Sequence, residues 1–232
     1  MVSRQGAIAI FVKTPGYSPL KTRLAQSIGQ IQAEQFHQLS AKAVEAVVRV
    51  VSEQKPVSPF WAVAEEAALT DPLWKRFPTI SQGTGDLGSR LSHIDQALSA
   101  KYDYVIFLGA DAPQLPIAYL TKAVEYLSEI TDRPQFVIGS ASDGGFYLFG
   151  SQICLTREAW LNVPYSDSKT VEKLREQIQD RGYILELPVL TDVDTVHELE
   201  TIQRQVGDVE SLLPEQLEVF EWIQKLDVQY PE

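Results

Sequence analysis

The sequence predicts an α/β fold of three layers, in which a mostly parallel sheet is covered by helices on both faces. Short apolar runs rich in β-branched residues alternate with longer segments in which apolar residues recur every three or four positions. This alternation is typical of strands that are joined by helical crossovers. The 232 residues contain no internal repeat and no linker-like stretch, so we expect a single domain over residues 1–232.

Each expected strand is a short apolar run that ends in turn residues, as residues 6–13 end before a Pro-Gly break. The strands predicted in this way are residues 6–13, 59–65, 102–111, two within 134–150, and 183–190. Each expected helix has an apolar face at three- and four-residue spacing, and Asp71 with Pro72 is typical of a helix start. One helix is predicted to begin near Lys21. The others are predicted over residues 31–52, 71–77, 89–100, 115–130, 168–182, 194–206 and 214–226. The last two form a C-terminal helical region at about 194–226.

Charge is distributed unevenly along the chain. The formal net charge is -11, yet residues 1–60 hold seven basic and three acidic side chains, whereas residues 192–232 hold two and eleven. Nucleic acid is disfavoured as a partner, because binding to its phosphates needs a basic surface. No stretch approaches the roughly 20 apolar residues that a membrane span needs. With a single cysteine, Cys154, no internal disulfide can form, and we expect a cytoplasmic protein.

The segment FVKTPGYSPLKTRLA, residues 11–25, gathers basic and turn-forming residues directly after the first strand. Its glycine permits unusual backbone angles, and its prolines stiffen the loop. The free N–H groups of the following helix favour an anion, and a Lys with an Arg suits phosphate oxygens. We therefore expect a nucleotide-phosphate site, although a loop with two surface cations is the alternative. The nucleotide-binding residues expected here are Lys13, Pro15, Gly16, Lys21, Thr22 and Arg23, with Lys21 and Arg23 also catalytic.

A single carboxylate, that of Asp111, follows the apolar strand within residues 102–111. Mg²⁺ and Mn²⁺ bind such oxygen ligands and share their coordination with substrate phosphates. We therefore expect Asp111 to be a catalytic metal ligand for Mg²⁺ or Mn²⁺. A helix cap is the alternative, since Asp is a common cap and Pro113 follows.

Two further acidic clusters follow later strands. The first places Asp143 before Gly144 and Gly145, where a backbone can approach a ligand closely, although Asp-Gly is also the usual chemistry of a tight turn. The second offers Asp192 and Asp194 as metal ligands, although one of them, more readily Asp194, is also a candidate N-cap. Ligands of such sheets bind at the carboxyl ends of the strands, so all these clusters are expected to converge on one crevice. The acceptor-binding residues that we expect there are Asp143, Gly144, Gly145 and Ser166.

A glycine-rich segment, QGTGDLGSRL, contains the G-x-G-x-x-G spacing at residues 83–88. A dinucleotide-binding fingerprint should follow the first strand, and this one lies far downstream. We interpret it as a flexible active-site loop in which Gly85, Asp86 and Arg90 contact the nucleotide. The three histidines, His37, His93 and His197, have no mutual spacing for zinc and are expected at the surface.

Taken in order, several motifs resemble a bacterial family of GT-A-type transferases, the selenium-domain-associated glycosyltransferases. The motifs that carry the resemblance are FVKTPGYSPLKTRLA, GDLGSRL, GADAPQLP, GSASDGGFYLFG, VPYSDSKTV and LTDVDTVHEL. The resemblance covers about residues 6–205 and extends distantly to phospholactate guanylyltransferase and the molybdenum-cofactor nucleotidyltransferases. It implies a nucleotide-diphospho-sugar transferase (GT-A) fold with a Rossmann-like sheet, a nucleotide over its first half and a divalent metal at Asp111. It also implies that Lys21 and Arg23 hold the phosphates and that Asp192 or Asp194 is a second metal ligand.

These observations predict a metal-dependent transferase that uses a nucleotide. The favoured reaction transfers a nucleotidyl group from an NTP to a small phosphorylated acceptor, because two cations in the first loop suit a triphosphate. One alternative is a glycosyltransferase with an NDP-sugar donor, for which a D-x-D motif around Asp111 is missing. Another is a non-catalytic nucleotide-binding module. The expected partners are a nucleotide (NTP or NDP-sugar) and a small-molecule acceptor, with a homodimer as a further candidate assembly.

Overall fold

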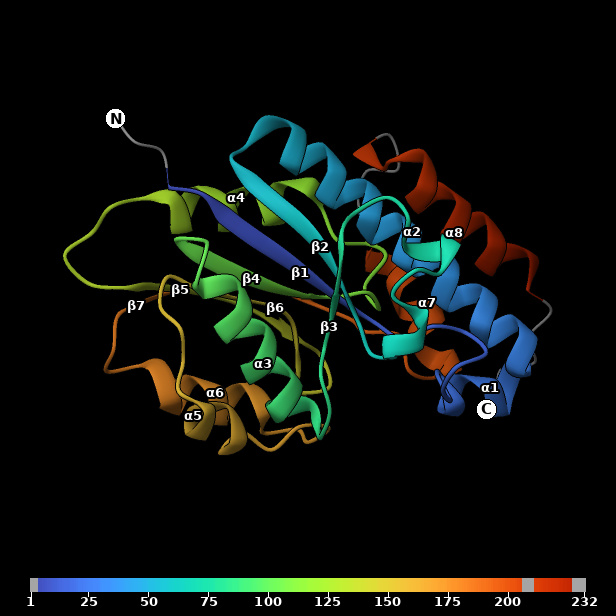
Figure 1. Cartoon of the computed structure of the whole chain (residues 1–232). Helices are drawn as coiled ribbons and strands as arrows, with labels where there is room; N and C mark the ends of the chain where they lie inside the picture. The colour runs from blue at the N-terminus through green and yellow to red at the C-terminus, as the bar shows by residue number, and fades with distance from the viewer. Residues whose placement is uncertain (1–3, 206–210, 227–232) are drawn as a thin grey trace.

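The computed structural model describes residues 4–205 and 211–226 and shows a seven-stranded sheet between layers of helices (Figure 1). The strand order is β3-β2-β1-β4-β6-β5-β7. Every neighbouring pair is parallel except the two pairs that contain β6, which runs antiparallel to both β4 and β5. The α/β class and the mostly parallel sheet predicted from the sequence are therefore confirmed.

The strands are short, as expected for apolar runs that are bounded by turns. They are β1 (Gly6–Val12), β2 (Val57–Val63), β3 (Thr79–Ser81), β4 (Tyr104–Gly109), β5 (Gln135–Ala141), β6 (Phe146–Ser151) and β7 (Tyr183–Leu190). Along β1, Ile8 and Ile10 pack on one face of the sheet while Ala7 and Ala9 pack on the other. A strand that is buried on both faces reads as a continuous apolar run, which is why β1 was recognisable from sequence.

The helices cover both faces of the sheet and add a further group at one side (Figure 1). They are α1 (Thr22–Ile28), α2 (Gln30–Gln54), α3 (Leu87–Ser99), α4 (Ile117–Ser128), α5 (Arg157–Leu161), α6 (Thr170–Ile178), α7 (Val196–Gln205) and α8 (Pro214–Lys225), with 3₁₀ turns at Glu66–Ala68 and Pro72–Trp74. As predicted, Asp71 caps the second turn, since its carboxylate accepts a hydrogen bond from the Leu73 backbone N–H. None of the helices in the described residues is long and apolar enough to cross a membrane.

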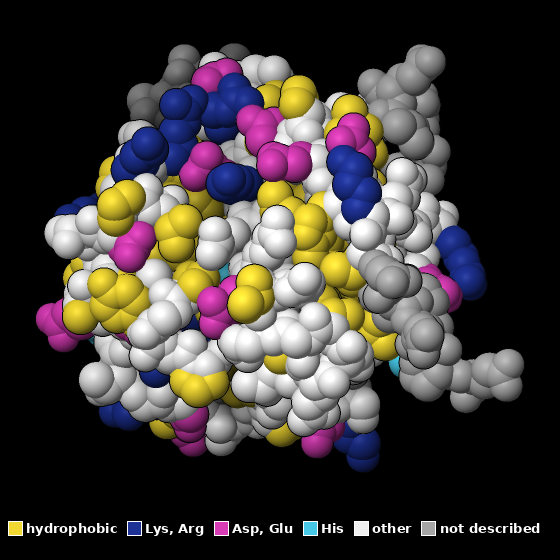
Figure 2. All heavy atoms as spheres, turned by 90° about the vertical axis from the view of Figure 1, so that its right-hand side faces the viewer, with side chains coloured by type: hydrophobic (Ala, Val, Ile, Leu, Met, Phe, Trp, Pro, Cys, Tyr) yellow, Lys and Arg dark blue, Asp and Glu magenta, His cyan; other side chains and the backbone are white. Residues whose placement is uncertain are grey.

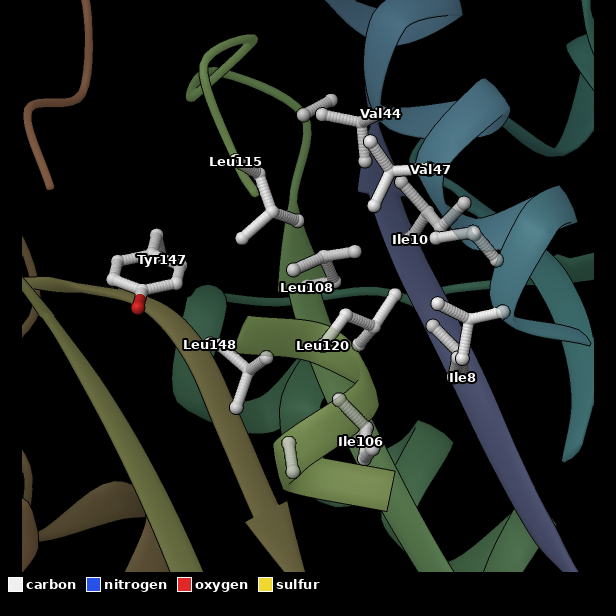
Figure 3. Close-up of a cluster of buried hydrophobic side chains, with 14 of the residues drawn as sticks. Ile8, Ile10, Val44, Val47, Ile106, Leu108, Leu115, Leu120, Tyr147 and Leu148 are labelled. Carbon is white, nitrogen blue, oxygen red and sulfur yellow. The ribbon is translucent and has the colours of Figure 1, made fainter. Parts of the chain in front are cut away.

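The apolar core has three parts. One joins the sheet to α2 and α4, and Figure 3 shows Ile8, Val47 and Leu108 within it. A second joins the opposite face to α3, α5 and α6. The third lies beyond the sheet, where α1, α7 and α8 pack against α2 through residues such as Leu24, Phe36 and Phe220. This third part ties the C-terminal helices to the loop that follows β1.

One strand, one α-helix and the 3₁₀ turn Glu66–Ala68 were not predicted, and several boundaries differ. Strand β3 and helix α5 are too short, at three and five residues, to show a hydrophobic period. Strand β4 ends at Gly109, so Ala110 and Asp111 lie in the turn beyond it rather than within the predicted strand over 102–111. The predicted helix over 194–206 begins two residues later, and its last residue, at position 206, lies outside the described residues.

Candidate active site

Two neighbouring hollows lie at the carboxyl ends of the parallel strands. The polar cleft, of about 350 Å³, is bounded by Lys13, Lys21, Gln82 and Asp111 among others. The apolar cavity, of about 160 Å³, is bounded by the rings of Phe11, Phe107, Phe146 and Tyr165 and by several carboxylates, including that of Asp192. Phe11 and Leu87 line both hollows and form the boundary between them. The predicted convergence at this sheet edge is therefore observed, but it is divided between two chemically different spaces.

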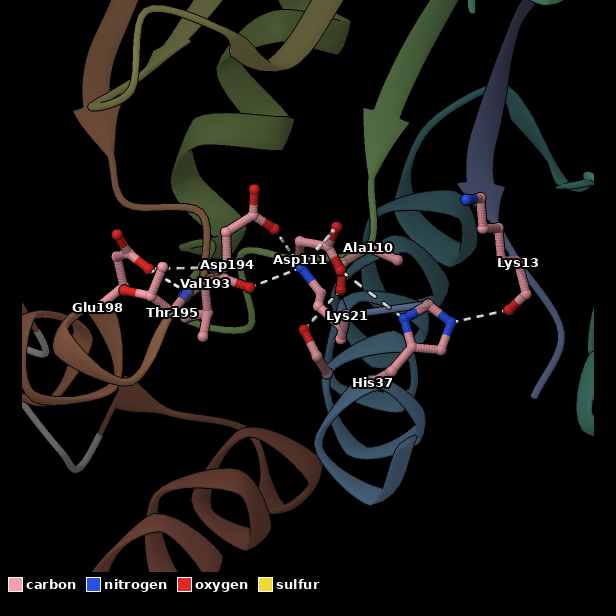
Figure 4. A network of polar contacts seen from close by, with 10 residues as sticks. Lys13, Lys21, His37, Ala110, Asp111, Val193, Asp194, Thr195 and Glu198 are labelled. Carbon is pink, nitrogen blue, oxygen red and sulfur yellow. Dashed lines mark hydrogen bonds and ion pairs between the residues drawn. The ribbon is translucent and has the colours of Figure 1, made fainter. Parts of the chain in front are cut away.

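The Lys21 ammonium is the centre of the polar network in the cleft (Figure 4). Its Nζ lies 3.0 Å from Asp111 Oδ2 and 3.0 Å from Asp194 Oδ1, and it donates a 2.6 Å hydrogen bond to the Val193 carbonyl. The Lys21 side chain is only 4% exposed, whereas the Asp111 and Asp194 side chains are 37% and 51% exposed. Lys21 itself adopts a left-handed backbone conformation (φ 46°) at the start of α1. The ammonium is thus held inside the protein while its carboxylate partners face the cleft.

The charges of this pair stabilise each other. Burial alone would lower the pKa of Lys21, but the carboxylates of Asp111 and Asp194 raise it above its ordinary value. Burial alone would raise the pKa of Asp111, but the Lys21 ammonium and His37 hold it well below its usual range. Both groups are therefore charged at neutral pH, as an anchor for phosphate or metal requires.

His37 was predicted to be a surface residue, and that prediction is wrong. It lies on α2 and is 4% exposed, with Nε2 2.8 Å from the Lys13 carbonyl and Nδ1 3.7 Å from Asp111 Oδ1. Because a carbonyl can only accept a hydrogen bond, Nε2 carries a proton and Nδ1 faces Asp111. His37 follows Ala33 by four residues and precedes Ala41 by four, so its place on the apolar face of α2 was the available signal. His93 and His197 are exposed, as expected.

The turn that carries Asp111 is anchored from three sides. The Ala110 carbonyl accepts a hydrogen bond from Ser40 of α2, and the Asp111 carbonyl accepts one from the Val193 N–H. From the C-terminal helix α8, the buried Gln216 amide donates to the Pro113 and Leu115 carbonyls at 2.8 and 3.1 Å. Asp111 is not a cap of α4, which begins six residues later at Ile117. The position of this carboxylate is therefore fixed by elements from both ends of the chain.

The loop after β1 is fixed by Glu65, which follows β2. The Glu65 carboxylate accepts hydrogen bonds from the Thr14 N–H and the Ser18 hydroxyl, and Trp74 Nε1 donates to the Thr14 hydroxyl. Lys13 Nζ donates a 3.3 Å hydrogen bond to the Pro19 carbonyl, across the same loop.

The predicted phosphate-binding residues of this loop do not all face the cleft. Lys13, Lys21 and Thr22 line it, whereas Pro15 and Gly16 lie at the loop tip and are not among its lining residues. Arg23 is exposed, makes no ion pair with another described residue and does not line the cleft. Lys21 therefore lines the cleft and Arg23 does not, although the sequence predicts that both bind the phosphates.

The glycine-rich segment forms a loop that is held in place rather than free. Arg90 donates to the Gly85 carbonyl at 3.0 Å and to Gln82 Oε1 at 3.2 Å, while Asp86 caps α3 by accepting from the Ser89 N–H. The Ser89 hydrogen bonds hold the pKa of Asp86 below its ordinary value. None of these three predicted contacts lines the cleft.

Instead, the buried Gln82 lines the cleft, and its amide bridges the Val12 and Ala62 carbonyls. Gln82 was missed because nothing local distinguishes a glutamine after a three-residue strand.

The turn between β5 and β6 forms one wall of the apolar cavity. Asp143 and Gly145 line the cavity, and Asp143 Oδ1 accepts a 2.8 Å hydrogen bond from the Gly145 N–H, so it also shapes the turn. Gly144 has φ +91°, and a Cβ there would lie 2.1 Å from the Ser168 carbonyl oxygen. Ser166 lines the same cavity with a left-handed φ of 58°. Three of the four predicted acceptor residues, Asp143, Gly145 and Ser166, therefore line one space, and Gly144 lies in the turn beside it.

Asp192 and Asp194 point to different hollows. Asp194 lines the polar cleft and contacts Lys21, whereas Asp192 lines the apolar cavity. Neither caps α7, because the Glu198 carboxylate accepts the N–H groups of Asp194 and Thr195. Burial and the nearby Asp111 carboxylate raise the pKa of Asp192 to about 7. The two aspartates thus serve the two hollows separately.

The residues present fit a divalent metal only in part. The described residues contain no cluster of three or more His, Cys, Asp or Glu side chains that could hold a metal ion, and Lys21 lies between Asp111 and Asp194. However, Asp111 Oδ1 and His37 Nδ1 are buried without a hydrogen-bond partner among the described residues. Mg²⁺ is often bound by one or two carboxylates together with substrate phosphates. The site therefore fits a metal that arrives with a nucleotide and binds at Asp111.

Comparison with solved structures supports this architecture. A protein of Desulfovibrio desulfuricans G20, provisionally assigned as a nucleotide-diphospho-sugar transferase, is 25% identical with a TM-score of 0.75, over 97% of this chain and 99% of that one. A cytidylyltransferase of Leptospira borgpetersenii serovar Hardjo-bovis is 15% identical with a TM-score of 0.54, over 99% and 100%. A Mycobacterium tuberculosis H37Rv protein in complex with manganese is 14% identical with a TM-score of 0.50, over 90% and 100%. No curated protein matches by sequence.

The fold, and the 25% identity over nearly the whole length of a related structure, place this chain in the transferase class with a nucleotide-diphospho-sugar transferase (GT-A) fold. The resemblance drawn from the motifs is thereby confirmed. The chain belongs to the DUF2064 family, described as an uncharacterized protein conserved in bacteria, whose model matches residues 43–167.

Proposed function

We propose that this chain is a metal-dependent nucleotidyltransferase that takes an NTP in the polar cleft and transfers its nucleotidyl group to a small acceptor in the apolar cavity. The observation that carries the proposal is the pairing of the buried Lys21 ammonium with Asp111 at the end of β4, inside a cleft of about 350 Å³. A cleft at the carboxyl ends of parallel strands is where such sheets bind their ligands.

The side chains of the cleft suit a nucleotide. Lys13 and Lys21 supply positive charge for phosphate oxygens, and Thr22 adds a hydroxyl. Gln82 also lines the cleft, and its amide is held by the Val12 and Ala62 carbonyls while its Oε1 accepts a hydrogen bond from Arg90. Arg23 is not placed against the cleft, so its predicted catalytic role stays a prediction.

In the proposed reaction, a nucleophilic atom of the acceptor forms a bond to the α-phosphorus of the NTP. The bond from that phosphorus to the bridging oxygen breaks, and pyrophosphate leaves with the electron pair; a hydroxyl acceptor also loses its proton to solvent. The Lys21 ammonium, held by three partners, would stabilise the charge on the phosphates through space, or directly by exchanging one of those partners for a phosphate oxygen. Mg²⁺ or Mn²⁺ bound at Asp111 would neutralise developing charge on the phosphates. Asp192 and Asp194 stay candidate second ligands.

A second candidate function is glycosyl transfer from an NDP-sugar. It is favoured by one observation, the 25% identity to the protein provisionally assigned as a nucleotide-diphospho-sugar transferase. Against it, Asp111 lies between Ala110 and Ala112 and so lacks a neighbouring aspartate for a D-x-D motif.

A thermal-shift panel tests the proposal. We expect NTPs with Mg²⁺ or Mn²⁺ to raise the melting temperature, because a ligand that binds the folded state stabilises it by mass action. A panel of NTPs and NDP-sugars without any shift, with and without metal, would refute both functions. Where binding occurs, pyrophosphate release from an NTP supports nucleotidyl transfer, and NDP release from an NDP-sugar supports glycosyl transfer.

A further inference from the structure

The apolar cavity differs from the cleft in the kind of side chain that lines it. Four aromatic rings, those of Phe11, Phe107, Phe146 and Tyr165, form much of its wall. The Tyr165 hydroxyl donates a 3.0 Å hydrogen bond to the Trp160 carbonyl, so its polar end is already used. A wall of this kind favours a flat or ring-shaped group with an apolar face.

The polar groups of the cavity are carboxylates. Asp143, Asp167 and Asp192 line it, while no Lys, Arg or His among the described residues does. Asp143 and Asp167 each use one oxygen to accept a backbone N–H, from Gly145 and Lys169. No hydrogen bond joins the Asp192 carboxylate to another described residue, and Asp143 is near enough to act on it electrostatically. The cavity therefore offers hydrogen-bond acceptors and negative charge, but no cation for an anion.

One residue in the wall of the apolar cavity has a strained backbone conformation. Ser166 has a left-handed φ of 58°, which costs a residue with a Cβ on the order of 1 kcal/mol. Ser166 contributes to the cavity between Tyr165 and Asp167. Such strain persists where surrounding structure imposes it, and here it aims a hydroxyl-bearing residue at the hollow that lies beside the proposed nucleotide site.

We propose that the acceptor group that enters the apolar cavity is an uncharged or cationic ring with hydroxyl or amino donors, and not a phosphorylated group. The aromatic wall takes the apolar face of the ring, and the free carboxylate oxygens accept its donors. A phosphate there would face the carboxylates of Asp143, Asp167 and Asp192, and the Lys21 ammonium, which acts on Asp192 from the adjoining cleft, is already paired with Asp111 and Asp194, so close approach of a phosphate is unfavourable. This replaces the phosphorylated acceptor that the sequence predicts. It rests on the proposed function in one respect, that the nucleotide occupies the polar cleft.

Three probes that share one ring and differ in charge test the proposal. Ligand-observed NMR titrations of the full chain, without nucleotide, would compare benzyl alcohol, benzylamine and benzyl phosphate. We expect benzyl alcohol and benzylamine to bind at least about tenfold more tightly than benzyl phosphate, which corresponds to roughly 1.4 kcal/mol. Equal or tighter binding of benzyl phosphate, or no binding of any probe, would overturn the proposal.

Two variants place the binding in the cavity. Gly109 lines it, and an added Cβ would find its nearest neighbour, the Tyr147 carbonyl oxygen, at 3.8 Å, so the Cβ of Gly109→Val has room and its methyl groups should occupy part of the cavity. We expect it to abolish probe binding, whereas Ala67→Val, on the exposed 3₁₀ turn, should leave binding unchanged. Unchanged binding in a folded Gly109→Val would contradict the proposal.

Asp143→Asn keeps an oxygen for the Gly145 N–H but removes one charge, so it should weaken benzylamine relative to benzyl alcohol by about threefold or more. Asp180→Asn, which changes an exposed acid outside both hollows, is the control. If Asp143→Asn leaves the ratio of the two affinities unchanged, the carboxylates do not select the charge of the ring.

A nucleotide thermal shift measured in parallel keeps the two proposals apart. Its failure would refute the function of the polar cleft, whereas the probe ranking refutes or supports the chemistry of the cavity.

Discussion

The two hollows at the carboxyl edge of the sheet adjoin each other but have opposite chemistry. In the polar cleft, carboxylates are paired with a buried ammonium, and the pKa of Asp111 is lowered. In the apolar cavity, carboxylates lie among aromatic rings with no cation among the described lining residues, and burial with the nearby Asp111 carboxylate raises the pKa of Asp192 to about 7. The cleft lies where the loop after β1 meets α1 and α2, and the cavity lies beside α3 and the loop before α6.

This difference shows that one sheet edge can carry two chemically different hollows if the helical layers on its two faces supply different side chains. On the face shown in Figure 2, Lys and Arg side chains are interspersed with Asp and Glu side chains. Around Lys21 the unlike charges are instead buried on one side, because the Lys21 side chain is only 4% exposed.

The largest effect is expected from Lys21→Ala. Loss of the ammonium removes the phosphate partner and leaves Asp111 and Asp194 uncompensated, so we expect turnover to fall by roughly 100- to 1,000-fold. Pyrophosphate release measured at saturating NTP checks this. Arg23→Ala should have a smaller effect, since Arg23 is exposed outside the cleft, and Lys42→Ala, on the exposed face of α2, is the control. An equal loss in the Arg23 variant would contradict the separation of the two residues.

Asp111→Asn should uncouple metal from nucleotide. Without a charged oxygen at the end of β4, Mn²⁺ should no longer add to the thermal shift produced by an NTP, a coupling of typically about 1–3 kcal/mol. The measurement is the melting temperature with NTP, with and without Mn²⁺, and Asp180→Asn is the control. Persistence of the full metal effect would remove Asp111 from the metal site.

On the cavity side, Gly144→Ala should destabilise the fold by about 2 kcal/mol, because a left-handed residue gains a Cβ that meets the Ser168 carbonyl. Gly16→Ala is a matched control: Gly16 also has a positive φ, but nothing lies within 4 Å of its added Cβ. Chemical denaturation of both variants would measure the difference. If both lose the same stability, strain alone is responsible and the contact between the two loops is unimportant.

The smallest effect is a dependence of stability on pH in metal-free protein. The pKa of Asp192 in the folded chain, about 7, lies above its unfolded value near 4, so the stability that it contributes is fully present below about pH 4 and is lost as pH rises through 7. Asp192→Asn should therefore gain about 1–2 kcal/mol over the wild type between about pH 5 and about pH 8. Denaturation in a chelator would show it. A constant difference would mean that Asp192 is solvated as in the unfolded chain.

Much of this architecture was predictable because it depends on local patterns. Buried strands such as β1 read as apolar runs, and the residues that follow their ends, such as Asp111 and Asp143, then map to one edge of the sheet by topology alone. The division of that edge into two hollows was not predictable. It depends on side-chain direction, as when Asp192 and Asp194, two residues apart, line different spaces.

Other features of the site depend on contacts between distant segments. His37 is buried because the loop after β1 folds over α2, and Gln82 is held by carbonyls of β1 and β2. Arg23 fits a phosphate site by composition, yet its position in the first turn of α1 leaves it exposed. In each case tertiary structure, rather than residue type, decides which polar groups reach the cleft.

The two hydrogen bonds from Gln216 to the turn beyond Asp111 have a consequence for the order of events during synthesis. The sheet and the loop after β1 are complete in the nascent chain well before α8 leaves the ribosome. The turn that carries Asp111 receives its last restraint only when Gln216 arrives, some hundred residues later. A ribosome-bound chain can therefore form the contacts of this turn with Ser40 and Val193 before Gln216 adds its two, so the turn that carries Asp111 is completed only near the end of translation.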